Sequence, residues 1–190
     1  MGKSTNRNEV ASNTILNPST RNPRTAMPRD SPENVQDPYL PGGHFHDGSV
    51  CTQCGAVFQK QHWTLDAEKR NLLVGSGGAI DVVCPACKIT TERNPQGIVT
   101  LSGDYLPLHR DDILNLVRNE EERGMSDNPL ERIINIREEG DALVIETTNE
   151  ALAQRIGRRV HKAHSGDVEY KWSGGNHLVR VNWQRSLEKK

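Results

Sequence analysis

The amino-acid sequence predicts an α+β protein, and three observations along the chain support that class. Residues 1–43 are rich in Asn, Ser, Thr, Pro and Arg. The chain has four cysteines, and all of them fall within residues 44–98 as two closely spaced pairs. Residues 129–190 show strand-like alternation on both sides of one helical pattern. That strand-strand-helix-strand-strand order predicts a small antiparallel sheet covered by helices, with residues 99–128 as a linker and a helix.

The N-terminal segment, residues 1–43, is predicted to be a disordered or extended arm. Its apolar residues are isolated and follow no helical or strand period. They are Val10, Ile15, Leu16, Val35 and Leu40. Such a segment buries too little apolar surface to offset the entropy lost on ordering, so it could order only along a large partner.

Composition and charge limit the classes of protein that the chain can belong to. Of its 190 residues 34% are hydrophobic, which suffices for one modest core and a small metal-dependent module. The net charge is −1, so binding to nucleic acid would have to rest on a local basic patch. No apolar run approaches the roughly 18 residues of a membrane span. The N-terminus also lacks an apolar signal segment, and we expect a soluble cytoplasmic protein without a membrane partner.

The cysteines form two Cys-x-x-Cys motifs, a pattern typical of a structural metal site. The predicted ligands are Cys51, Cys54, Cys84 and Cys87, with 29 residues between the two motifs. Gly55 allows a sharp turn after the first motif, and Pro85 fixes φ inside the second. Two such turns joined by a hairpin supply four thiolates in a tetrahedron, which suits Zn²⁺. We therefore predict a zinc ribbon over residues 44–98, with the glycine-rich residues 75–78 as a hairpin tip.

Other uses of the cysteines fit the sequence less well. Two disulfides would need an oxidising compartment, and a redox Cys-x-x-Cys motif usually occurs singly. Iron stays open as an alternative metal, because four thiolates also suit an iron centre. A site closed by four cysteines has no free coordination position and is structural. His44, His46 and His62 lie near the first pair, and we expect them to be solvated.

The remaining elements follow from periodicity and from turn residues. Residues 98–101 are expected to form a short strand or an extended linker. A helix is predicted over residues 110–123 and ends at Gly124. Strands are then predicted over residues 132–137, 142–148, 168–172 and 178–183, and a helix over residues 150–163. Asn149 is the predicted N-cap of that helix.

The helix predicted over residues 150–163 concentrates positive charge that could bind RNA. Its basic residues recur three to four positions apart, and they are Arg155, Arg158, Arg159 and Lys162. Such a row on a rigid helix can contact successive phosphates. Alternatively, the arginines form an ordinary solvated face, with some of them paired to acids of the sheet. Trp172 and Trp183 could stack on bases or belong to the core. Lys60 and Trp63, after the first cysteine pair, are further candidates for RNA contact.

Several motifs occur in a characteristic order along the chain. They are Cys-x-x-Cys-Gly at 51–55, Cys-Pro-x-Cys at 84–87, and the segments 97–103, 109–121, 128–133, 147–153 and 179–183. Over residues 48–185 the chain thereby resembles a group of small prokaryotic zinc-ribbon proteins. Its double cysteine region is also similar to that of the ribosome export adaptor named for nonsense-mediated decay, which binds the large subunit. The resemblance implies metal ligation by the four cysteines and favours a ribosomal partner.

Together these features predict a non-enzymatic zinc protein that binds the ribosome or another structured RNA. Such a protein could occupy a functional centre of idle or maturing ribosomes. An alternative is a zinc-dependent adaptor that contacts another protein through the ribbon or through the acidic residues 120–122. A DNA-binding regulator is a third hypothesis, although no helix-turn-helix pattern is evident. No Ser-His-Asp or Cys-His arrangement stands out, so the sequence predicts neither a catalytic residue nor a small-molecule substrate.

Overall fold

The computed structural model describes residues 45–173 and 178–187, which contain four helices and two sheets. The predicted N-terminal arm, residues 1–43, lies outside the described residues. All described residues belong to one of the two units into which the chain divides, the unit spanning Asn34–Lys190. Among them, no helix combines the length and the apolar character that crossing a bilayer requires.

The first sheet holds the cysteine region and has the strand order β3-β2-β1-β4. Strands β1 (Ser49–Cys51), β2 (Val57–Gln59) and β3 (His62–Thr64) pair antiparallel, whereas β4 (Ile80–Val82) runs parallel to β1. A parallel pair needs a crossover connection, and helix α1 (Ala67–Gly75) provides it. The prediction that residues 75–78 form a hairpin tip is therefore wrong.

Helix α1 was not predicted, although a cap for it is present in the sequence. The Asp66 side chain accepts a hydrogen bond from the Lys69 backbone N–H at 3.0 Å and so caps the helix. At the other end, the Gly78 N–H donates to the Leu73 carbonyl, and Gly77 has φ +69. The glycine-rich segment thus ends a helix, because glycine tolerates the left-handed backbone needed there.

The second sheet has five strands in the order β6-β7-β5-β9-β8. The predicted ββαββ succession is present in β6 (Ile133–Glu139), β7 (Ala142–Thr147), α4 (Glu150–His164), β8 (Asp167–Trp172) and β9 (Val179–Gln184). Strand β5 (Gly97–Ser102) lies at its centre, antiparallel to β7 and parallel to β9. The sheet is consequently mixed and larger than the sequence predicted. The apolar side chains of Val99 and Leu101 in β5 are completely covered, as expected for a strand at the centre of a sheet.

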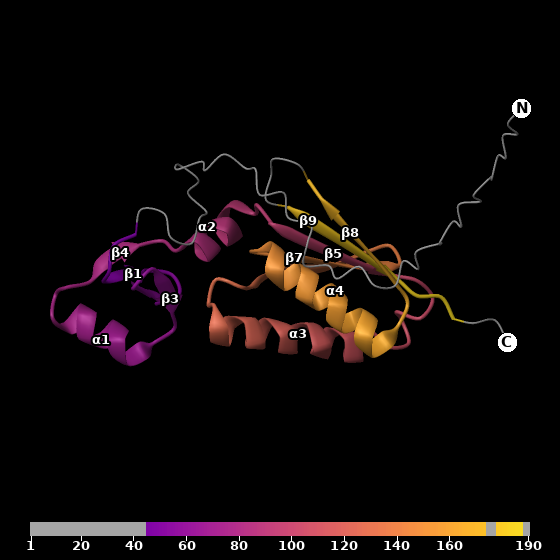
Figure 1. Cartoon of the computed structure of the whole chain (residues 1–190), viewed down its shortest axis with the longest axis horizontal. Coiled ribbons are helices and arrows are strands. Elements are labelled where there is room, and N and C mark those ends of the chain that lie inside the picture. The colour runs from indigo at the N-terminus through magenta and orange to yellow at the C-terminus, as the bar shows by residue number, and fades with distance from the viewer. Residues whose placement is uncertain (1–44, 174–177, 188–190) are drawn as a thin grey trace, which may run out of the picture. The chain divides into compact units, whose positions relative to one another are not determined.

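Helices α3 (Arg110–Asp127) and α4 lie on the same face of the five-stranded sheet (Figure 1). Their apolar side chains, among them Ile113, Val117 and Ile156, join those of the sheet in one core. Asn149 caps α4 as predicted, since its side chain accepts from the Leu152 N–H at 3.0 Å. Helix α3 continues past its predicted end, and Gly124 is buried within it. A Cβ on Gly124 would lie 2.3 Å from an Arg155 nitrogen, so glycine here permits close packing and does not stop the helix.

Candidate metal centre and basic surface

The first cysteine pair lies in the tight turn between β1 and β2. Cys51 ends β1, and its N–H donates to the Ala56 carbonyl at 2.8 Å. The Gly55 N–H returns to the Cys51 carbonyl at 2.9 Å, with φ +74 at Gly55. This is the left-handed conformation that the sequence analysis expected of this glycine.

The second pair lies at the beginning of a helix and not in a second hairpin turn. Cys84 is the N-cap of α2 (Pro85–Glu92), where its sulfur accepts from the Cys87 N–H at 3.5 Å. Pro85 occupies the first turn, a position where its missing N–H costs nothing. The partial positive charge at the N-terminal end of the helix opposes the increase in pKa that both of these thiols show in the structure.

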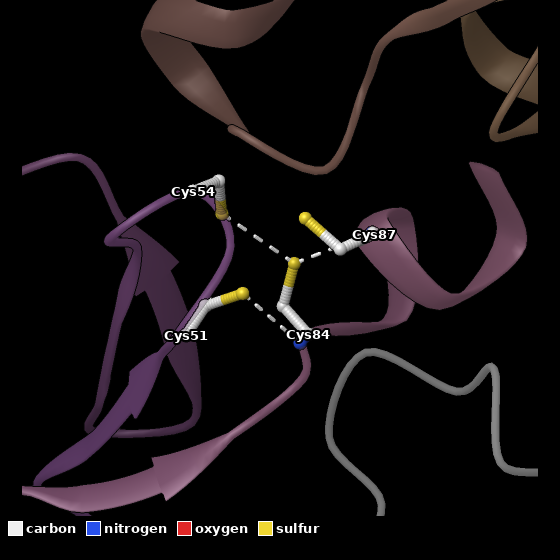
Figure 2. Close-up of side chains that lie close together, drawn as sticks. All are labelled: Cys51, Cys54, Cys84 and Cys87. Carbon is white, nitrogen blue, oxygen red and sulfur yellow. Dashed lines mark hydrogen bonds between the residues drawn. The ribbon is translucent and has the colours of Figure 1, made fainter. Parts of the chain in front are cut away.

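The four sulfur atoms converge on one point between these two elements (Figure 2). All of them lie within 4.8 Å of one another, and all four thiols are free. Four sulfurs placed about 2.3 Å from a tetrahedral ion stand about 3.8 Å apart. The Cys54 and Cys84 sulfurs already meet this spacing at 3.7 Å. The cluster can therefore hold a metal ion after small side-chain adjustments.

The cluster contains no other candidate ligand among the described residues. His46 and His62 are exposed, as the sequence analysis expected. His44 lies outside the described residues. A four-thiol set without an additional donor is a closed site, which suits a structural ion.

The thiols of the cluster are electrostatically coupled. The hydrogen bond from Cys84 and, to a lesser degree, the nearby Arg132 lower the pKa of Cys54 to about 4, against the effect of burial. The same hydrogen bond raises the pKa of Cys84, whose proton is shared with Cys54. Burial raises the pKa of Cys87 to about 11. Metal binding must displace the protons of Cys84 and Cys87, so it is coupled to proton release.

Two residues from a distant part of the chain complete the surroundings of the cysteines. The Arg132 Nη1 atom donates toward the Cys87 sulfur at 3.7 Å. Leu130 is buried in the same apolar cluster as the cysteines. The sequence analysis missed both residues. Arg132 begins the strand predicted over residues 132–137, Leu130 lies in the segment before it, and no local spacing relates either residue to the cysteines.

The two candidate RNA contacts near the first cysteine pair differ in exposure. Lys60 is exposed in the turn between β2 and β3, where its N–H donates to Asp47 at 2.8 Å. Trp63 is only 4% exposed and packs against Phe45 and Phe58, with ring centroids 4.9 and 5.2 Å away. Because these rings and the apolar cluster around the cysteines cover Trp63, its predicted contact with RNA is not retained.

The basic residues of α4 also divide into two groups. Arg155 and Arg159 pair with Glu120, which is 3% exposed, through contacts of 3.5 and 2.8 Å. Arg155 also pairs with Glu131 at 2.5 Å. The alternative that the arginines are paired with acids therefore holds for Arg155 and Arg159, but the acids lie on α3 and in the segment after it and not in the sheet. Arg158 and Lys162 remain exposed.

The two tryptophans of the second sheet differ in exposure. Trp183 belongs to the core with no exposed surface, and its indole N–H donates to the Ser165 carbonyl at 2.6 Å. A stacking role for Trp183 is therefore wrong. Trp172 is 44% exposed and stacks on Tyr170 with ring centroids 6.1 Å apart. Burial raises the pKa of Tyr170, and the charge of neighbouring Arg158 opposes that increase.

Comparison of the chain with protein-family models, curated proteins and solved structures finds no match. Only the residues of the chain itself therefore indicate what it does.

Proposed function

We propose that this protein is a non-enzymatic zinc protein that binds structured RNA through Arg158, Lys162 and Trp172. We call these three residues the α4–β8 surface. The observation that carries the proposal is that Arg158 and Lys162 are exposed and form no salt bridge among the described residues, while the exposed Trp172 ring stacks on Tyr170, which lies near Arg158. Ribosomal RNA, in the cytoplasm, is the RNA that the similarity of the double cysteine region to that of the ribosome export adaptor favours.

Zinc is the metal that best fits the donor set. Four thiolates in a tetrahedron suit Zn²⁺ or an iron centre, and a closed four-cysteine site is the usual arrangement of a structural zinc. The core around the cysteines is small, consisting mainly of Phe45, Phe58, Trp63, Ala56 and Ala86. A small core of this kind commonly needs a metal to fold, so zinc would keep the first sheet rigid.

The α4–β8 surface has the two kinds of side chain that RNA binding requires. Arg158 and Lys162 lie four residues apart on one helix, a spacing that suits neighbouring phosphates. Trp172 lies in the edge strand β8, where its ring could stack on an unpaired base. Stacking on an aromatic side chain contributes about 1–3 kcal/mol per base. The surface therefore favours an RNA with loops or bulges over a regular duplex.

Fluorescence anisotropy with a labelled rRNA fragment that contains an internal loop tests the proposal. Trp172→Ala should weaken binding by about 5- to 150-fold, which is the stacking contribution expressed as affinity. Trp172→Phe keeps an aromatic ring and should retain most of the affinity. Equal affinity of the alanine variant and the wild type would overturn the proposal.

Charge reversal at Arg158 tests the phosphate contact. Arg158→Glu should weaken binding and reduce the dependence of affinity on salt concentration. Arg118→Glu is the matched control, because Arg118 is an exposed arginine on α3. An equal loss in both variants would indicate a general charge effect and contradict a specific surface. Arg155 and Arg159 are unsuitable for this test, since their ion pairs with Glu120 support the fold.

A protein partner is the second candidate, and exposed aliphatic side chains of residues 45–92, which form the first sheet, α1 and α2 and are called the metal module, favour it. Helix α1 has no buried residue, and Leu72 is 73% exposed. The exposed aliphatic residues of this module are Leu65, Leu72, Val74, Ile80 and Val83. Exposed apolar side chains gathered in one module are typical of a protein-binding surface. An adaptor would form a nuclease-resistant complex that is lost in Leu72→Glu, whereas ribosome co-sedimentation through RNA would survive that change.

A further inference from the structure

The short segment between α3 and β6 contacts the cysteine cluster. Leu130 is buried among the cysteines and the aromatic residues of the metal module. Two residues later, Arg132 directs Nη1 toward the Cys87 sulfur at 3.7 Å. Its Nε donates to the Pro129 carbonyl at 2.7 Å, which fixes the direction of the side chain. The guanidinium is therefore held against the cysteines by its own chain segment.

The backbone of the same segment is bonded to the five-stranded sheet. The Arg132 N–H donates to the Thr148 hydroxyl at 2.8 Å, and the Thr148 N–H donates to the Arg132 carbonyl at 2.9 Å. Thr148 is buried directly before the N-cap of α4. Glu131 meanwhile accepts from Arg155 of α4. Residues 131 and 132 thus tie the cysteine cluster to both the sheet and α4.

The charge of a metal-bound cysteine cluster would favour a cation at the position of Arg132. Four thiolates around a divalent ion leave a net charge of −2, and a neighbouring cation offsets part of it. The Arg132 Nη2 atom is buried and has no hydrogen-bond partner among the described residues. A buried guanidinium nitrogen without a partner is costly, and sulfur atoms are good candidates to accept from it. Ordering of the cysteines around a metal would bring acceptors of this kind together.

We propose that Arg132 is a positioning residue of the metal centre, which donates N–H···S hydrogen bonds to the thiolates and couples metal occupancy to the stability of the β6–β7 end of the five-stranded sheet. Coupling of this kind is reciprocal, so a metal that orders the cysteines also stabilises the Arg132–Thr148 pair. Loss of a residue that orients metal ligands typically costs 10- to 100-fold in metal affinity. The inference requires zinc at the cysteines but does not depend on RNA binding.

Two measurements on the full chain test this proposal. The first is Zn²⁺ affinity, determined by competition with a chromophoric chelator. Arg132→Met should bind zinc about 10- to 100-fold more weakly, and Arg132→Lys should lie between it and the wild type. Arg110→Met is the matched control, because Arg110 pairs with exposed Glu138 and contacts no cysteine. Wild-type zinc affinity in Arg132→Met would overturn the proposal.

The second measurement needs no variant and therefore holds even if Arg132→Met fails to fold. Hydrogen exchange of the Thr148 amide is followed by NMR with zinc bound and after chelation. We expect exchange to become at least tenfold faster without zinc. Unchanged exchange at Thr148 would overturn the coupling while leaving the metal site intact. Failure of the wild-type chain to bind zinc would instead refute the metal centre itself.

Discussion

Replacement of the buried Glu120 on α3 is the strongest test of how α3 and α4 are held together. Glu120 is 3% exposed, and its carboxylate forms salt bridges with three arginines, which are Arg123, Arg155 and Arg159. Glu120→Ala removes the carboxylate and leaves these guanidinium groups without that partner. Breaking a fully buried ion pair costs about 3–5 kcal/mol. The arginine side chains are 66%, 28% and 40% exposed, so solvent screens part of the loss.

We expect Glu120→Ala to lower the free energy of unfolding by about 2–3 kcal/mol, because Arg155 keeps Glu131 as a partner. With a urea m-value of about 2 kcal/mol/M, the midpoint falls by about 1–1.5 M. The assay is urea denaturation followed by far-UV circular dichroism with excess zinc present. The exposed neighbour Glu122 provides the control, since Glu122→Ala should change the stability by no more than about 0.5 kcal/mol.

A double-mutant cycle separates the pair from the loss of the side chain itself. The Arg159 Nε and Glu120 Oε1 atoms are 2.8 Å apart, so the coupling energy should be about 1–2 kcal/mol after screening. A coupling energy near zero, or a midpoint in Glu120→Ala within about 0.3 M of the wild type, would refute the structural role of these arginines. It would also return Arg155 and Arg159 to the set of candidate RNA contacts.

Three further perturbations have defined outcomes. Chelation of the metal, or Cys84→Ser, should loosen the first sheet and expose Trp63, which a red shift of tryptophan emission detects. Burial lowers the pKa of His164 below its ordinary 6.5, so below about pH 6.5 the unfolded chain binds more protons. Stability should therefore fall between pH 7.5 and 5.5, and less steeply in His164→Gln. Gly157→Ala should cost about 1–3 kcal/mol in thermal denaturation, because its Cβ would lie 2.5 Å from Val181 in the core.

Matched variants make these outcomes decisive. Gly75→Ala adds a methyl group where nothing lies within 4 Å and should leave the melting temperature nearly unchanged. An emission spectrum that is insensitive to chelation would show that the first sheet does not need a metal. A core that accepts Gly157→Ala without loss would contradict the packing described between α4 and β9.

Local patterns sufficed for much of the second sheet. Period-two alternation predicted β6, β7, β8 and β9, and Asn149 marked the beginning of α4 correctly. Strand β5 was only half recognised, because its place between β7 and β9 depends on pairing with residues far along the chain. Helix α2 was missed for a related reason: Cys84 was interpreted as a metal ligand alone, although it also caps a helix.

The candidate RNA contacts show the same division. A row of four basic residues on α4 is visible in the sequence, but the burial of Glu120 beneath two of them is not. Each of the three tryptophans is flanked by polar residues in the sequence. Their exposed fractions nevertheless range from none at Trp183 to 4% at Trp63 and 44% at Trp172. Only Trp172 stays available for stacking. Trp183 lies in the interior strand β9, and Trp63, although its strand β3 is an edge strand, is covered by Phe45 and Phe58.

Spacing along the chain by itself determined the four cysteines as a set, since two sulfur atoms three residues apart converge whenever the backbone turns between them. It also determined the α+β class, because side-chain periodicity is a property of neighbouring residues. Tertiary structure alone decided that Arg132 lies against those sulfurs and that Arg155 and Arg159 are neutralised. These contacts join residues 24 to 45 positions apart, and their energy depends on burial, which no local pattern specifies.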